Sequence, residues 1–171
     1  MNLSNISTNQ NYINDIKNFI ITIPNYHTFT LIDIGCGNGN TLKELSLNKI
    51  KSIGIELDKN TAEEANKNKN KLMIIKNINM IDYKFENTKT IIYLYEPLFM
   101  VYKIQATLLY YKLLENIKEN INKEIYIIYL SGIYRRDIED RLLKNFGFKL
   151  IFNKNYLIRE LNVYIYKPKR L

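Results

Sequence analysis

The stretch that decides the fold is Leu31-Ile32-Asp33-Ile34-Gly35-Cys36-Gly37-Asn38-Gly39-Asn40. A short apolar run ends in the acid Asp33, and glycines then follow at every second position, 35, 37 and 39. A stretch with helical character begins at Thr41. A strand, a glycine-rich turn and a helix in this order build a ligand site in an open α/β sheet, because the helix N-terminus faces the ligand. The sequence therefore predicts a site for a nucleotide-type ligand at this turn.

The spacing of the glycines distinguishes two kinds of nucleotide site. A dinucleotide-binding turn reads G-x-G-x-x-G and would need a glycine at position 40, where the chain has Asn40. The pattern D-x-G-C-G-x-G found here resembles motif I of the class I S-adenosylmethionine-dependent methyltransferases. The residues that this resemblance assigns to the aminoacyl part of S-adenosylmethionine are Asp33, Gly35, Gly37 and Gly39.

A tight strand–helix turn without a ligand is the alternative interpretation of these glycines. Glycine lets the backbone approach a ligand and adopt conformations that other residues avoid, and three glycines after an acid favour the ligand site. Cys36 is interpreted as a small packed residue rather than a nucleophile, because no histidine or second cysteine accompanies it. His27, the only histidine, precedes the first strand and is expected to be a loop residue. No spacing of Cys or His predicts a metal site.

Composition predicts a globular protein of one domain. The 171 residues include 46% hydrophobic residues and one cysteine, which fits a reducing, cytoplasmic compartment. No apolar run is long enough to span a membrane, and Met1–Gln10 lacks the pattern of a signal peptide. The net charge of +8 comes from dispersed lysines, so it favours a basic surface over a nucleic-acid track.

Hydrophobic periodicity predicts strands that alternate with helices. The predicted strands are Thr30–Ile34, Ser52–Leu57, Leu72–Lys76, Thr90–Tyr95, Glu124–Leu130, Phe148–Asn153 and Ile158–Tyr166. Predicted helices run through Ile13–Ile23 (capped by Ser7 or Thr8), Leu42–Leu45, the residues after Asp58, Ala106–Ile117 and Ile138–Phe146, with a turn at Ser131-Gly132.

This order predicts an α/β fold, a doubly wound and mostly parallel seven-stranded sheet with a C-terminal antiparallel hairpin and helices on both faces. The expected organisation is a single methyltransferase domain over residues 1–171, with an N-terminal helical segment (1–24) and a Rossmann-like core (30–166). The order of elements is similar to that of the methyltransferase sheet, and only the glycine turn is specific to the family.

Three further residues are candidates for binding the cofactor. Glu56 lies near the end of the second predicted strand, where a carboxylate accepts hydrogen bonds from ribose hydroxyls in related folds. Asp58 is the competing acid, but its position suits a helix cap. Asn79 stands where many family members have an acid that contacts adenine, and Met80 could pack on the adenine face or fill the core.

The end of the fourth strand, Tyr95-Glu96-Pro97, resembles motif IV of a group of small methyltransferases and of base-amino methyltransferases. Glu96 replaces the asparagine of that motif, so we interpret it as a general base or a substrate-orienting group. Tyr95 would offer an aromatic face to a cationic donor or ammonium group. The arginine pair at positions 135 and 136 is as consistent with an ordinary surface as with an anionic substrate.

The resemblance implies methyl transfer from S-adenosylmethionine to an amine or hydroxyl acceptor. A chain of this length has little room for a substrate-recognition insertion, which favours a macromolecular acceptor or a partner subunit. A protein side chain is the first expectation and RNA or DNA the second. A non-catalytic methyltransferase-like binding subunit and a nicotinamide-dependent oxidoreductase remain as alternatives, and the oligomeric state is open.

Overall fold

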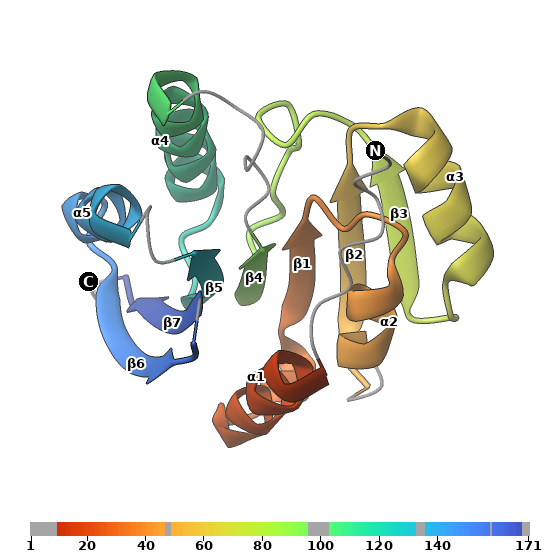
Figure 1. Ribbon diagram of the computed structural model, residues 1–171, viewed down its shortest axis with the longest axis horizontal. Coiled ribbons are helices and arrows are strands. Elements are labelled where there is room, and N and C mark those ends of the chain that lie inside the picture. The colour runs from red at the N-terminus through yellow and green to blue at the C-terminus, as the bar shows by residue number, and fades with distance from the viewer. Residues whose placement is uncertain (1–9, 47–48, 96–102, 133–135, 158, 169–171) are drawn as a thin grey trace. The chain divides into compact units, whose positions relative to one another are not determined.

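The computed structural model describes residues 10–46, 49–95, 103–132, 136–157 and 159–168 of the 171-residue chain. Within these residues, seven strands form one mixed sheet in the order β3-β2-β1-β4-β5-β7-β6. The strands are β1 (Thr30–Ile34), β2 (Lys51–Glu56), β3 (Met73–Asn77), β4 (Thr90–Tyr95), β5 (Ile125–Gly132), β6 (Lys149–Asn155) and β7 (Arg159–Tyr166) (Figure 1). β2 pairs in parallel with β1 and β3, β4 pairs in parallel with β5, and β7 pairs antiparallel with β5 and β6. The predicted fold class is confirmed.

Helices precede β1, β2, β3, β5 and β6, whereas among the described residues β3 leads to β4 and β6 leads to β7 without a helix. The helices are α1 (Gln10–Thr22), a short 3-10 helix (Tyr26–Thr28), α2 (Asn40–Ser46), α3 (Lys59–Asn68), α4 (Lys103–Asn120) and α5 (Arg136–Asn145). In the part of the chain that the structure describes, no helix is long and apolar enough to cross a membrane. The chain divides into two compact units, Met1–Met80 and Ile81–Leu171.

The first unit contains the parallel strands β1, β2 and β3. Every residue of β1 is buried, as expected of a strand that is covered on both faces. In α1 the isoleucines at positions 13, 16 and 20 are buried, and Lys17 bonds Glu44 of α2 at 2.8 Å. α3 buries Ala62 and Ala65, whose small side chains permit close helix packing.

The second unit contains β4 to β7 with α4 and α5. The hydroxyls of Tyr110 in α4 and Tyr129 in β5 lie 3.2 Å apart, and the Tyr164 hydroxyl of β7 donates to Asp140 of α5 at 3.0 Å. Tyr164 pairs with Ile127, two residues before Tyr129, so alternation puts both tyrosines on one face of the sheet. α4 and α5 therefore contact the same face.

The predicted turn at Ser131-Gly132 is wrong. Both residues extend β5, because Ser131 pairs with Glu160 and Gly132 pairs with Arg159 of β7. The sequence offers a small polar pair that resembles a turn, but the antiparallel partner strand keeps it extended. Elsewhere the predicted boundaries either agree or shift by one to three residues, and the proposed caps Ser7 and Thr8 lie outside the described residues.

Candidate functional site

The glycine loop, Gly35–Gly39, connects β1 to α2 and needs glycine at three positions. Gly35, Gly37 and Gly39 have φ angles of 76°, 54° and 77°, in the left-handed region that other residues adopt only with strain. A Cβ at Gly39 would lie 3.3 Å from the Ala65 Cβ of α3, whereas a Cβ at Gly37 would meet nothing within 4 Å. Gly39 thus permits helix packing, and Gly37 leaves open space beside the backbone.

Glu56, the last residue of β2, holds the glycine loop with its carboxylate. Its Oε2 accepts a hydrogen bond from the Gly37 amide at 3.0 Å, and its Oε1 accepts one from the Asp58 amide at 2.9 Å. A carboxylate has about four lone-pair sites, so each oxygen can still accept a second donor. The amides of Gly35 and Cys36 both donate to the Ile55 carbonyl, at 2.8 and 3.1 Å. The loop is therefore fixed to β2 by backbone and side chain.

Asp58, the competing acid, is engaged in capping α3. Its Oδ1 accepts from the amide of Thr61 at 2.8 Å and from the Thr61 hydroxyl at 2.6 Å. These hydrogen bonds lower the pKa of the Asp58 carboxyl. The predicted helix cap is confirmed, and of the two acids Glu56 is the one bonded to the glycine loop.

Asp33, at the fourth position of β1, is buried with only 2% of its surface exposed. Burial raises the pKa of its carboxyl from 3.8 to about 8, and the negative charge of Glu56 adds to the increase. At neutral pH the carboxyl is therefore largely protonated. A buried acid beside a second acid and an open glycine loop is typical of a site that receives a positive charge from a ligand.

Gly54 is a residue of this region that sequence reasoning missed. It lies in β2 opposite Asp33, and a Cβ there would come within 2.6 Å of the Cys36 Sγ and 3.0 Å of the Leu42 Cδ2. Cys36 is thus buried over a glycine, which agrees with its interpretation as a small packed residue. Burial and the charges of Asp33 and Glu56 raise the pKa of its thiol, so the reactive thiolate is scarce at neutral pH.

Gly54→Ala is expected to destabilise the protein by about 1–3 kcal/mol, the usual cost of overpacking a core. The new methyl would displace Cys36 and the glycine loop with it. Urea unfolding would measure the loss of stability. Addition of Cys36→Ala should restore part of it, because the Sγ is the nearest clashing atom; no rescue would mean that the clash is with Ile75 or Leu42 instead.

Asn77, the last residue of β3, is a second residue that sequence reasoning missed. Its side-chain amide donates to the backbone carbonyls of Glu56 at 3.0 Å and Leu57 at 2.9 Å, and it pairs with Glu56 across the strands. It therefore fixes the end of β2 that carries the Glu56 carboxylate. Of the two predicted adenine contacts nearby, Asn79 is half-buried and Met80 is buried.

The second unit holds the residues predicted for catalysis. Tyr95 is the half-buried last residue of β4, and Glu96 lies outside the described residues. The guanidinium carbon of Arg159 lies 4.9 Å from the centroid of the Tyr95 ring, so one face of this ring already holds a cation. Arg135 is also outside the described residues.

His27, in the first unit, is exposed and packs edge-on against Tyr26 at 5.9 Å between ring centroids. No cluster of metal-binding side chains occurs among the described residues.

The amino-acid sequence matches no protein-family model and no curated protein, but solved structures share the fold. One is magnesium protoporphyrin IX methyltransferase from Synechocystis PCC 6803 with bound SAM, at 11% identity and a TM-score of 0.72 over 91% of this chain and 78% of that one. The fold is that of the class I SAM-dependent methyltransferases. An RNA methyltransferase from Salinibacter ruber in complex with S-adenosylhomocysteine aligns over 97% of this chain and 96% of that one, at 13% identity and a TM-score of 0.65.

A third methyltransferase structure is the ribosomal protein L11 methylase of Lactobacillus delbrueckii subsp. bulgaricus. It is 10% identical, with a TM-score of 0.65 over 92% of this chain and 80% of that one. The three neighbours are named for a porphyrin, an RNA and a protein. This fold is therefore shared by proteins that are named for different acceptor classes, and the fold alone does not indicate an acceptor.

Proposed function

We propose that this protein is an S-adenosylmethionine-dependent methyltransferase that binds its donor at the glycine loop. The observation that carries the proposal is the hydrogen bond from the Gly37 amide to the Glu56 carboxylate, made by a loop with three left-handed glycines. A carboxylate beside a backbone with open space is a suitable acceptor for ribose hydroxyls, which supports the proposal. Fold similarity to methyltransferases supports the proposal.

The residues of the first unit fit this donor. Open space at Gly37 lets a ligand approach the backbone, and both oxygens of Glu56 keep accepting capacity after their two hydrogen bonds. The donor carries a sulfonium cation, and the buried Asp33 with its raised pKa is a group that a nearby cation would ionise. Asn79 and Met80, after β3, are proposed to contact the adenine edge and face.

The donor supplies an activated methyl group, and the protein contributes chiefly by positioning donor and acceptor. Glu96, which lies outside the described residues, is proposed to orient or deprotonate an amine or hydroxyl of the acceptor. Tyr95, beside it in sequence, would limit the position of the acceptor with its ring. The sequence alone ranks a protein amine first and a nucleic acid second as acceptor.

Calorimetric titration with S-adenosylmethionine tests the proposal, and binding in the micromolar range is expected. S-adenosylhomocysteine should compete, and NADH should not bind. No heat and no thermal shift with either adenosyl compound would contradict the methyltransferase function and leave the non-catalytic binding subunit, whereas NADH binding would favour an oxidoreductase. Transfer of a labelled methyl group into a cell lysate, followed by protease and nuclease digestion, would then identify the class of acceptor.

A further inference from the structure

Three charged or aromatic side chains of the second unit lie together on one face of the sheet. Tyr95 pairs with Leu130 of β5, Leu130 pairs with Leu161 of β7, and Leu161 pairs with Lys154 of β6. Arg159 lies two residues before Leu161 on β7. Because side chains alternate between the faces of a strand, Tyr95, Lys154 and Arg159 point to the same side.

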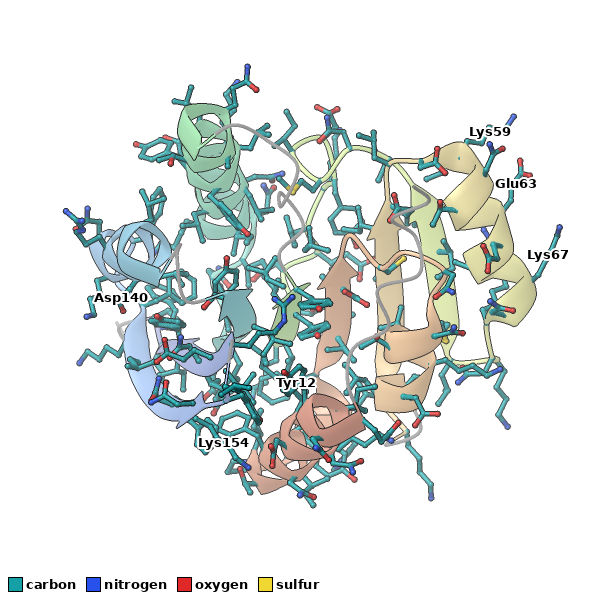
Figure 2. All side chains as sticks on the ribbon, in the orientation of Figure 1. Tyr12, Lys59, Glu63, Lys67, Asp140 and Lys154 are labelled. Carbon is teal, nitrogen blue, oxygen red and sulfur yellow. The ribbon has the colours of Figure 1, made fainter. Side chains whose placement is uncertain are left out.

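These residues also lie at the same edge of the sheet, because β4 ends at Tyr95 and β7 begins at Arg159. Lys154 is the penultimate residue of β6, next to the β6–β7 connection (Figure 2). This is the edge formed by the carboxyl ends of the parallel strands β4 and β5, where open α/β sheets bind their ligands. α4 and α5 contact the opposite face through Tyr129 and Tyr164.

Both cations on this face lie over aromatic rings. The Arg159 guanidinium is 4.9 Å from the Tyr95 ring centroid, and the Lys154 ammonium is 5.6 Å from that of Tyr156. Arg159 reaches Tyr95 across β5, where its paired residue is Gly132. Since glycine has no side chain, it leaves the guanidinium a path over the strand. The glycine at the end of β5 therefore allows the Arg159 side chain to lie over the Tyr95 ring.

Cations that alternate with aromatic rings are typical of surfaces that bind single-stranded nucleic acid. Arginine binds phosphate with two parallel hydrogen bonds, and aromatic rings stack on unpaired bases. Leu157, in the same β6–β7 connection, is 94% exposed and adds apolar surface. A protonated lysine of a protein acceptor would instead be repelled by Arg159 and Lys154.

We propose that Tyr95, Lys154, Tyr156 and Arg159, here named the basic edge, bind a single-stranded nucleic acid that carries the methyl acceptor. Arg159, held flat by Tyr95, and Lys154 bind phosphates of the strand, and Tyr156 stacks on a base. The identification of this strand as the methyl acceptor rests on the proposed methyltransferase function, whereas its binding to the basic edge does not.

Binding is tested with a fluorescent single-stranded RNA of about 12 mixed-sequence nucleotides, a length within the usual range for such surfaces. Fluorescence anisotropy of the full chain should show affinity at least tenfold lower for Lys154→Gln/Arg159→Gln than for the wild type. The matched control is Lys67→Gln/Lys71→Gln, two exposed lysines of the first unit that remove the same charge, with less than a twofold effect expected. The slope of the logarithm of affinity against the logarithm of salt concentration should be shallower by about 1.4 for Lys154→Gln/Arg159→Gln, since two phosphate contacts are lost.

Two further variants separate binding from folding. Lys154→Gln alone changes an exposed side chain, and about threefold weaker binding is expected without a change in thermal unfolding. Tyr156→Leu should weaken binding about tenfold at unchanged charge, because base stacking is lost. Equal losses for the basic-edge and control double variants, or unchanged binding in Tyr156→Leu, would overturn the proposal.

The acceptor is tested by labelled methyl transfer to total RNA and to total protein. RNA should be labelled by the wild type and at least tenfold less by Lys154→Gln/Arg159→Gln, with calorimetric binding of S-adenosylmethionine unchanged. Label in protein alone would overturn the basic edge as an acceptor site and leave the methyltransferase function standing. Absent binding of S-adenosylmethionine with intact RNA binding would contradict the methyltransferase function and leave the basic edge as a nucleic-acid site.

Discussion

Asp33→Asn is expected to stabilise the protein by several kcal/mol at pH 8 and by only about 1.6 kcal/mol at pH 5. Asp33 is buried in β1, and burial together with the charge of Glu56 raises the pKa of its carboxyl from 3.8 to about 8. The ionised form is therefore unfavourable in the folded state. Asparagine has nearly the same shape and cannot ionise, so the variant avoids this penalty at every pH.

The direction of the pH dependence follows from proton uptake. In the unfolded chain the carboxyl ionises near its ordinary pKa of 3.8, whereas in the folded protein it keeps its proton up to about pH 8. Between these values folding takes up a proton, so the free energy of unfolding falls as pH rises, by at most about 1.4 kcal/mol per pH unit. The full loss is on the order of 5 kcal/mol and is complete above pH 8.

Urea unfolding at pH 5, 6, 7 and 8 would measure this difference. The stability of the wild type should fall across the series relative to Asp33→Asn, and the gap should be widest at pH 8. Asp58→Asn serves as the control because the pKa of Asp58 is lowered by its bonds to Thr61, so no gain at pH 8 is expected. Parallel pH profiles for the wild type and Asp33→Asn would contradict the protonated state of Asp33.

A carboxyl that lowers stability at neutral pH needs a compensating role. Stabilising substitutions are commonly available at positions that function constrains, and perturbed acids cluster in functional sites. The Asp33 side chain is buried, a second acid contributes to its raised pKa, and the residue lies two positions before the glycine loop. The buried carboxyl of Asp33 thus lowers the stability of the folded protein and also complements a cationic ligand. Asp33→Asn is therefore expected to raise stability and to lose this complementarity.

The sequence identified those parts of the fold that depend on local pattern. Thr30–Ile34 and Thr90–Tyr95 are strands with the predicted bounds, because each is a short and mainly apolar run with clear limits. The Asp58 cap follows from side-chain chemistry within three residues of chain. The glycines at positions 35, 37 and 39 have positive φ angles, as their spacing predicts. A positive φ favours glycine so strongly that the pattern can be recognised in the sequence.

The rest depends on residues that meet only after folding. Nothing in the sequence distinguishes Gly54 from any other glycine in an apolar strand. In the folded protein, a Cβ at this position would lie 2.6 Å from the Cys36 Sγ. Asn77 belongs to a chain rich in asparagine, and only its bonds to the carbonyls of Glu56 and Leu57 distinguish it. The stacking of Arg159 on Tyr95 joins positions far apart in sequence, and the strand order β4-β5-β7 brings them together.

Glu56→Gln is expected to weaken binding of S-adenosylmethionine by about a hundredfold. Hydrogen bonds to a charged acceptor contribute about 1.5–3 kcal/mol each, and a loss of about 3 kcal/mol corresponds to this factor. The glutamine side chain keeps one carbonyl oxygen, whereas the carboxylate uses both oxygens, one for the Gly37 amide and one for the Asp58 amide. The NH2 group of glutamine cannot accept, so one backbone amide loses its partner and the glycine loop loses part of its fixed geometry.

Asp58→Asn is the matched control for this substitution. It removes the same charge two residues away, and asparagine caps helices as well as aspartate does, so α3 should remain intact. Calorimetry should show binding within about twofold of the wild type for Asp58→Asn and about a hundredfold weaker for Glu56→Gln, with both variants folded by thermal unfolding. Equal losses would mean that the acids act only through net charge. A loss confined to Glu56→Gln would assign binding to the one carboxylate that is bonded to the glycine loop, because both variants remove one negative charge and the two acids are only two residues apart.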